Sequence, residues 1–300
     1  MNSGVAAITS PLAFARDRVM AYYELNKPRV LTMVLITTLA GFYMGSGGPF
    51  DLADALKVLA GTALAAGGTL ALNQYFERDT DAIMVRTRDR PLPSGRLIPI
   101  EALLFGLLTS VAGLVFLWRA VNPLSATVTG AITFLYLAAY TPMKRYSWMC
   151  HVVGAIPGAL PPLIGWAAAR NGLSAEPWVL FGIMFLWQLP HSLSIARIYQ
   201  EDYARAGMSL LPKERPYGNP ANLLMLTATI VLVAFGTLPT WMGFAGRIYL
   251  VAAVILGAVM LYHSVRLVRS MATEAGARRV MLLSLIYLPA VLMVMVLDKV

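Results

Sequence analysis

The chain has 300 residues, of which 58% are hydrophobic and 13% are charged, and its mean hydropathy is +0.66. A soluble domain carries about 25% charged residues, so the composition excludes an ordinary water-soluble protein and indicates helices that lie in lipid. The net charge of +9 is scattered over short loops and Cys150 is the only cysteine, which argues against nucleic-acid binding, an internal disulfide and a cysteine-rich metal site.

Residues 1–28 precede the first long apolar stretch. Arg16 and Arg18 follow a weakly apolar portion, and no long apolar core with a small-residue cleavage site comes after a basic start. A cleaved signal peptide is therefore not expected. We expect an interfacial or flexible N-terminal arm, followed by a single membrane domain over residues 29–300.

Apolar windows that are punctuated by Pro, Gly and charged residues predict about nine membrane-spanning helices. They lie near 29–47, 54–78, 98–118, 123–141, 149–169, 177–199, 220–242, 247–268 and 279–297. The predicted fold class is therefore all-α, a polytopic transmembrane helical bundle. An odd number of spans puts the two termini on opposite sides of the membrane.

The 24 Lys and Arg residues are divided unequally between the two sides of this predicted bundle. All but five share the side of the N-terminus, and those five are Lys57, Arg119, Arg170, Arg247 and Lys299. The positive-inside rule assigns the richer side to the cytoplasm. We expect a multi-pass protein of a bacterial-type inner (plasma) membrane with a cytoplasmic N-terminus, and a mitochondrial inner membrane fits the same pattern.

Asn73, Glu77 and Asp81 close the second predicted span at positions i, i+4 and i+8, which places them on one face of a helix. The stripe begins at membrane depth, where an ionisable residue is by default a functional hypothesis. Two carboxylates and an amide oxygen suit Mg²⁺, which completes its shell with water and phosphate oxygens. The alternative is a solvated helix end with local Glu–Arg pairs.

A polar loop rich in arginine follows the stripe immediately. Its candidate anion-binding residues are Arg86, Thr87, Arg88, Arg90 and Arg96. Guanidinium groups match phosphate oxygens in a two-point fashion. Pro91, Pro93 and Gly95 end the helix and fold the chain back. We therefore expect the carboxylates of the stripe and the arginines of the loop to lie together at one Mg²⁺-diphosphate site.

The end of the fourth predicted span carries a second basic signal. Pro142 interrupts the helix and leaves Lys144 and Arg145 at the interface, where long cationic side chains reach a phosphate pocket or simply follow the positive-inside rule. Lys27, next to Pro28, has the same two interpretations. The sequence leaves both open.

A third signal lies in the sixth predicted span, where His191 follows Pro190 about two turns below the interface. A histidine in this place can bind iron, act as a base, or be a hydrogen-bonded core residue. His151 and His263 are weaker candidates because neither belongs to a cluster.

The segment from Asn73 to Arg96, NxxxExDxDxxMxRTxxRPLPSGR, closely resembles the first signature of the protohaem IX farnesyltransferases, or haem O synthases, of the UbiA superfamily of intramembrane prenyltransferases. Further matching motifs follow in the family's order. They are LNKPRV at 25–30, YTPMKR at 140–145, GAIPGALPPLIGW at 154–166, WQLPH at 187–191, EDYARAG at 201–207 and SLIYL at 284–288. The resemblance therefore covers most of the chain.

The resemblance implies a UbiA-type fold and transfer of a farnesyl group from farnesyl diphosphate to the vinyl group of haem b. Water addition then gives haem O, with diphosphate released. The implied sites are Asn73, Glu77 and Asp81 for Mg²⁺, Arg86, Thr87, Arg90, Lys144 and Arg145 for diphosphate, and His191, Tyr140 and Asp202 for haem. Of these, Asn73, Glu77, Asp81, Arg86, Arg90 and Lys144 are the expected catalytic residues.

The chain departs from the family pattern at Ser192, Ser194, Ile195 and residues 209–210. These positions surround His191, so the expected binding site for the prenyl acceptor is the part that differs most from the family. Two alternatives follow. One is a UbiA-type prenyltransferase with another aromatic or tetrapyrrole acceptor, and the other is a membrane transporter. Beyond the two substrates and the lipid bilayer, the expected partner is a haem A synthase or an oxidase assembly protein.

Overall fold

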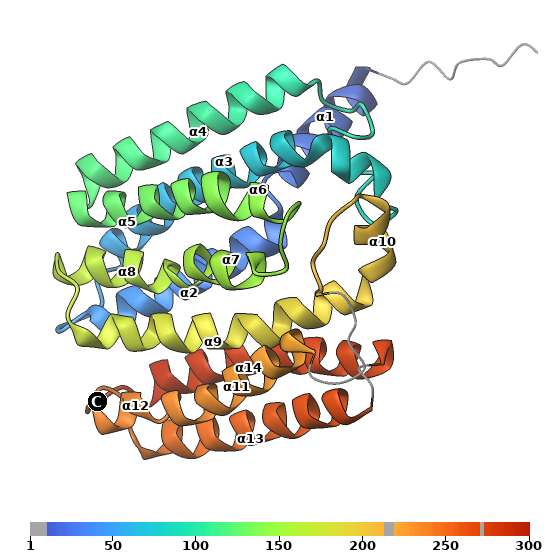
Figure 1. The fold of residues 1–300 in the computed structure, drawn as a ribbon. Coiled ribbons are helices and arrows are strands. Elements are labelled where there is room, and N and C mark those ends of the chain that lie inside the picture. The colour runs from blue at the N-terminus through green and yellow to red at the C-terminus, as the bar shows by residue number, and fades with distance from the viewer. Residues whose placement is uncertain (1–10, 213–218, 271–272) are drawn as a thin grey trace, which may run out of the picture.

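The computed structural model describes residues 11–212, 219–270 and 273–300, which form helices without β-strands (Figure 1). The first ten residues of the predicted N-terminal arm lie outside this range. The elements are α1 (Pro11–Leu25), α2 (Pro28–Gly45), α3 (Leu52–Ile83), α4 (Pro99–Ala120), α5 (Pro123–Phe134), η1 (Leu135–Tyr140), α6 (Thr141–Met143), α7 (Cys150–Ala159), α8 (Pro161–Arg170), α9 (Ala175–Ile198), α10 (Gln200–Arg205), α11 (Pro220–Phe235), α12 (Leu238–Trp241), α13 (Arg247–Arg269) and α14 (Glu274–Leu297). The all-α prediction is confirmed.

Within the described residues, nine helical segments are long and apolar enough to cross a membrane, at the places that the sequence predicts. Two of them are interrupted: residues 123–143 combine α5, η1 and α6, and residues 150–170 combine α7 and α8. The second span is longer than predicted, because α3 continues without a break to Ile83. The stripe Asn73–Glu77–Asp81 therefore lies within one continuous helix.

Proline sets the start of many helices. Pro28, Pro99, Pro123, Pro161 and Pro220 each occupy the first turn of a helix. At this position the missing N–H costs nothing, because the first amides of a helix have no intrahelical acceptor, and the ring fixes φ at a helical value.

Glycine allows two helix pairs to approach closely, as is common between membrane helices. A Cβ atom on Gly165 of α8 would overlap the carbonyl oxygen of Thr38 on α2, and a Cβ on Gly41 would overlap the carbonyl of Pro162. Gly68 on α3 and Gly106 on α4 allow the same approach between those helices. The backbones are thus in direct contact at both interfaces.

The helices run side by side in a bundle with α9 in its interior, packed against α7, α8, α11 and α14 (Figure 1). The C-terminal end of α3, the short helix α10 and helix α1 lie at one end of the bundle, on the right of the figure. We call this the site end. The opposite end, where α2 ends and α3 begins, is the far end.

Replacing Gly165 by Ala tests the close approach of α2 and α8. We expect a loss of about 1–3 kcal/mol of folding stability, because the new methyl group has no space against the Thr38 carbonyl. Thermal unfolding of the purified protein in detergent measures the effect.

Gly130→Ala in α5 is the matched control, since its new Cβ would meet only Leu114 at 3.8 Å. Alanine has the higher helix propensity, so this variant should be neutral or slightly stabilised. Equal melting temperatures for both variants would contradict the packing described here.

Candidate functional site

Three polar side chains of α3 form a buried stripe near the site end of the bundle. Asn73, Glu77 and Asp81 have relative exposures of 0%, 7% and 2%. Their spacing puts them on one face of a continuous helix. The structure therefore excludes the alternative of a solvated helix end.

Each member of the stripe accepts a hydrogen bond from a cation that comes from a different segment. Lys27 donates to Oδ1 of Asn73 at 2.5 Å, and Lys144 donates to Oε1 of Glu77 at 2.7 Å. Arg90 donates to Oδ2 of Asp81 at 2.6 Å. The structure thus places Lys27 and Lys144 at the stripe, a question that the sequence left open.

Lys27 reaches the stripe because the chain turns sharply between α1 and α2. Lys27 itself has a left-handed backbone (φ 46°), and Asn26 donates its side-chain amide to the carbonyl of Tyr22 at 2.7 Å. Gln74, next to Asn73, donates to the carbonyls of Glu24 and Leu25 at 3.0 and 2.9 Å. Helix α1 is therefore tied to α3 beside the stripe.

A π-helical turn, η1, orients Asn73. Thr141 donates its hydroxyl to the carbonyl of Tyr136, five residues earlier, at 2.8 Å, and accepts from Nδ2 of Asn73 at 2.9 Å. With Nδ2 occupied in this way, Oδ1 of Asn73 is turned toward Lys27 as an acceptor. Single π-turns of this kind are frequent at functional sites.

The arginine-rich loop after α3 folds back as predicted. Gly95 has a left-handed backbone (φ 73°), and Thr87 donates its hydroxyl to the carbonyl of Asp81 at 2.9 Å. Arg96 donates to the carboxylate of Glu24 at 2.5 Å and to the carbonyl of Asp89 at 2.8 Å. Arg96 thereby fixes the loop to α1 and does not point to the stripe.

Arg86 and Asp202 contact each other and do not lie at the stripe. The carboxylate of Asp202 in α10 accepts from the backbone N–H groups of Val85 and Arg86, both at 3.2 Å, and is paired with Arg205. The Arg86 guanidinium lies 5.0 Å from the centre of the Tyr199 ring. Burial opposes ionisation of Asp202, but the hydrogen bonds from Arg205 and the two amides lower its pKa.

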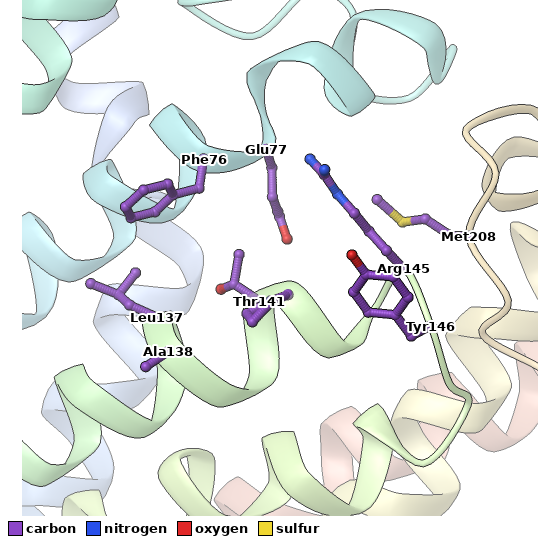
Figure 2. Close-up of a pocket in the computed structure, with 9 residues that line it drawn as sticks. Phe76, Glu77, Leu137, Ala138, Thr141, Arg145, Tyr146 and Met208 are labelled. Carbon is purple, nitrogen blue, oxygen red and sulfur yellow. The ribbon is translucent and has the colours of Figure 1, made fainter.

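A cavity of about 380 Å³ opens beside Glu77 (Figure 2). Its wall includes Thr141, Arg145, Tyr146 and Met208. Figure 2 shows Arg145 extending from the turn after α6 toward Glu77. A predicted diphosphate residue and a predicted metal ligand therefore line the same space.

A smaller apolar cavity of about 100 Å³ lies deeper in the bundle between α2, α3, α5 and the broken fifth span. Val34, Leu70, Ile132 and Pro157 belong to its wall. Tyr136 of η1 also lines it, one turn from Tyr140 and Thr141. An apolar cavity thus lies deeper in the bundle than the carboxylate stripe.

His191 lies in a separate array between α9 and α14. Its Nδ1 is 2.7 Å from the hydroxyl of Ser284, and its ring stacks on Trp187 with centroids 5.0 Å apart. Trp187 donates to the carbonyl of Ser284 at 2.7 Å. The sequence marked Ser284 only as the first residue of the SLIYL motif and gave it no role, because a serine inside an apolar span carries no further signal until its neighbour is known.

Tyr140 is the one predicted haem residue that touches the cationic cluster, with the Lys144 ammonium 4.4 Å from the centre of its ring. His151 is buried, and its Nε2 is bonded to the carbonyl of Leu210 at 2.9 Å. The stripe and the cations bonded to it therefore form the assembled core of the site, whereas His191, Asp202 and Arg86 lie outside this core.

The cluster carries more positive than negative charge. Burial, and then the positive charge of Arg90, lower the pKa of Lys27 to about 7. Burial also acts against the charge of Lys144, but the Glu77 carboxylate outweighs it and holds the pKa of Lys144 well above its ordinary value. Lys144 and Arg90 balance the two carboxylates, and the partly protonated Lys27 together with Arg145 on the cavity wall leaves an excess of positive charge, which suits an anionic ligand.

The donor set fits Mg²⁺ shared with a phosphate. Asn73, Glu77 and Asp81 present hard oxygen atoms on one face. No group of three or more His, Cys, Asp or Glu side chains suited to a metal occurs in the described part of the chain. The remaining coordination positions would thus belong to water and phosphate, as is usual for Mg²⁺.

Comparison with curated proteins identifies relatives that span almost the whole chain. A protoheme IX farnesyltransferase of Solibacter usitatus is 46% identical over 288 residues, covering 93% of this chain and 98% of that protein. The enzyme of the same name from Opitutus terrae is 38% identical over 278 residues, covering 93% and 94%. The resemblance drawn from the motifs is confirmed.

Solved structures share the fold. A structure described as digeranylgeranylglyceryl phosphate synthase matches with a TM-score of 0.79 at 19% identity, covering 94% of this chain and 98% of that one. A UbiA homologue from Archaeoglobus fulgidus bound to DMAPP and Mg²⁺ matches with a TM-score of 0.62 at 14% identity, covering 91% and 98%. At these identities the likeness concerns the fold alone.

The model of the UbiA prenyltransferase family matches residues 34–286, from the first span into the last. This match includes the carboxylate stripe and most of the cations around it. Together with relatives that cover more than nine-tenths of the chain, it shows that the chain belongs to the UbiA prenyltransferase family and is a multi-pass integral membrane protein.

Proposed function

We propose that the protein transfers the farnesyl group of farnesyl diphosphate to the vinyl group of haem b, giving haem O and diphosphate after addition of water. The observation that carries this proposal is the buried stripe Asn73–Glu77–Asp81, whose members are each held by a separate cation. The names of the curated relatives support the choice of both substrates. A UbiA homologue that holds DMAPP and Mg²⁺ supports the choice of metal.

The cationic side chains would bind and orient the diphosphate. Lys144 and Arg90 already lie at the stripe, and Arg145 lines the adjoining cavity. Arginine pairs with phosphate through two parallel hydrogen bonds. Mg²⁺ bound by Asn73, Glu77 and Asp81 would neutralise negative charge on the leaving diphosphate. Thr87 supports this arrangement indirectly, by holding the backbone at Asp81.

The apolar cavity beyond Tyr136 would hold part of the farnesyl chain. Cleavage of the allylic C–O bond leaves the electron pair with diphosphate and gives a farnesyl cation. The terminal vinyl carbon of haem forms the new C–C bond, and the resulting cation is delocalised into the porphyrin until water adds and loses a proton. A dry, apolar wall protects both cations from early capture by water.

His191 is proposed to contact haem through Nε2. The Ser284 hydroxyl donates to the carbonyl of Met281 at 2.6 Å, so its oxygen accepts the proton on Nδ1 of His191. This arrangement fixes the tautomer and leaves a lone pair on Nε2. A metal-binding histidine typically donates its other N–H in this way.

The site end is proposed to face the cytoplasm of a bacterial-type plasma membrane, because most Lys and Arg residues lie there. Residues 1–28 would form an arm on that side, with α1 held by Arg18–Glu101 and Arg96–Glu24 ion pairs. The product would pass to a protein that uses haem O, such as a haem A synthase or an oxidase assembly protein.

The test of this function supplies the purified protein with labelled farnesyl diphosphate, haem b and Mg²⁺, and looks for haem O by chromatography and mass spectrometry. Removal of Mg²⁺ with a chelator should stop product formation. Product from a different aromatic acceptor, and none from haem, would favour another UbiA-type reaction. Anion counterflow without a covalent product would favour a transporter.

In the same assay, Glu77→Gln and Asp81→Asn should each lower turnover by about 100-fold or more, because they remove charge that faces the metal and the diphosphate. Asp79→Asn is the matched control, since Asp79 lies on the same helix with its side chain 77% exposed. Wild-type turnover in Glu77→Gln or Asp81→Asn would overturn the metal assignment.

Asp202→Asn tests the link between α10 and the arginine-rich loop. The variant keeps the size of the side chain but weakens the bonds to the amides of Val85 and Arg86, so the loop is held less firmly. We expect the KM for farnesyl diphosphate to rise by about fivefold or more, the equivalent of ~1 kcal/mol, with a smaller change in kcat. Glu201→Gln, at the exposed neighbouring position, should behave as the parent protein.

His191→Ala should abolish binding of ferric haem, measured by its absorption spectrum, while binding of farnesyl diphosphate stays unchanged. Ser284→Ala should weaken haem binding by about tenfold, since it removes the acceptor that fixes the His191 tautomer. His263→Ala serves as the control. An unchanged haem spectrum and turnover in His191→Ala would remove His191 from the acceptor site.

A further inference from the structure

An apolar groove of about 590 Å³ lies between the first and last spans, α2 and α14. Its wall includes Ile36, Tyr43, Phe50, Pro289, Met293 and Val296, and it offers almost no polar atoms. Ile36 and Met293 are 44% and 64% exposed, so the groove opens toward the surrounding lipid. It does not share wall residues with either cavity at the carboxylate stripe.

The groove follows a seam in the bundle. Helix α2 packs extensively against α8, and α14 packs extensively against α9 and α13, whereas α2 and α14 touch each other sparsely. A hollow at such a seam in a membrane must be filled by lipid, because no water is present to fill it.

Two cations, Lys299 and Arg170, lie at the far end of the bundle next to the groove. Lys299 donates to the carbonyls of Tyr43 and Ser46, both at 2.6 Å, and its ammonium lies 4.8 Å from the centre of the Tyr43 ring. Arg170 donates to the carbonyl of Gly45. Both positive charges therefore sit at the C-terminus of α2, directly beyond the apolar wall.

The two cations are not paired with the acid next to Lys299 in the chain, because the carboxylate of Asp298 accepts from the backbone N–H of Tyr249 at 2.7 Å. Among the described residues, neither Lys299 nor Arg170 has a carboxylate within salt-bridge distance, although Glu176 interacts with Arg170 at longer range. A helix C-terminus contributes only about half a negative charge. Burial, and then the repulsion of Arg170, lower the pKa of Lys299. An ammonium has three donors, so one remains for a ligand.

The length of the groove matches one leaflet. From Ile36 to Ser46, α2 rises about 15 Å at 1.5 Å per residue, which is half of the roughly 30 Å hydrocarbon core. The stretch of α14 from Pro289 to its last residue, Leu297, rises about 12 Å, and Lys299 follows two residues later. The apolar wall thus covers the depth of a single acyl chain, and the cations stand at the level of its headgroup.

We propose that this groove is a binding site for an anionic phospholipid of the far-end leaflet, with one acyl chain between α2 and α14 and its phosphate on Lys299 and Arg170. The lipid completes the seam between the first and last spans. Because it binds the folded bundle, it raises the stability of the protein in proportion to its concentration. This site is independent of the reaction proposed above.

The test uses the full-length protein, delipidated in a neutral detergent. Phosphatidylglycerol and phosphatidylcholine with the same acyl chains are titrated separately, and retained lipid is counted by native mass spectrometry while the melting temperature is followed. The parent protein should retain phosphatidylglycerol preferentially and melt at a higher temperature with it. Equal retention and equal stabilisation by the two lipids would overturn the proposal.

Lys299→Gln and Arg170→Gln should each weaken phosphatidylglycerol binding by about fivefold, the contribution expected of one cation at a membrane surface. Lys57→Gln is the matched control, because Lys57 is an exposed far-end cation paired with Asp54. Lys299→Arg should retain binding, which separates loss of charge from damage to the end of α2. Unchanged binding in both Gln variants would also overturn the proposal.

The substitution Met293→Trp tests whether the groove binds the acyl chain. The larger side chain fills the groove and should lower retention of both lipids. Leu108→Trp, on the exposed face of α4 at 69% exposure, controls for a bulky residue that faces lipid elsewhere. Undiminished lipid retention in Met293→Trp would show that the groove is not the binding place.

Discussion

A charge placed at membrane depth is stable only when an opposite charge is brought to it, since neither lipid nor an apolar helix face can solvate it. Glu77 and Asp81 on α3 impose this constraint on the whole site end of the bundle. The cations that satisfy it come from three separate segments: Lys27 from the turn before α2, Lys144 from the end of the fourth span, and Arg90 from the loop after α3. Each of these cations lies outside a helix, with Lys27 between α1 and α2, Lys144 directly after α6 and Arg90 between α3 and α4.

Buried ion pairs of this kind add little net stability, because the cost of removing two charges from water offsets their attraction. Their retention in this bundle is better explained by chemistry. In the proposed reaction, the side chains that neutralise the carboxylates would exchange them for phosphate oxygens, so the donors would be in place before the leaving group acquires charge. The close approach of helices at Gly41 and Gly165, and at Gly68 and Gly106, helps to keep the surrounding interior compact.

The donor half and the acceptor half of the proposed reaction lie on different parts of the bundle. The carboxylate stripe belongs to α3, whereas His191 and Ser284 belong to α9 and α14. Asp202 joins the two parts, because it lies in α10 and binds the backbone of the loop that follows α3. The first and last spans, α2 and α14, touch each other sparsely along their length, although Lys299 ties the segment after α14 to the end of α2. The proposed lipid would fill the seam between these two spans near the far end.

The sequence alone determined the nine spans, their punctuation by proline, and the stripe on one face of the second helix, because these depend on composition and on the local period of a helix. It also indicated the basic loop and the chemistry that carboxylates and arginines share. Only the tertiary structure decided which cation contacts which member of the stripe, that Thr141 orients Asn73, and that the Ser284 hydroxyl lies beside Nδ1 of His191. These partners are 46, 67, 68 and 93 residues apart. Contacts over such distances depend on the path of the chain through the bundle, which no local pattern contains.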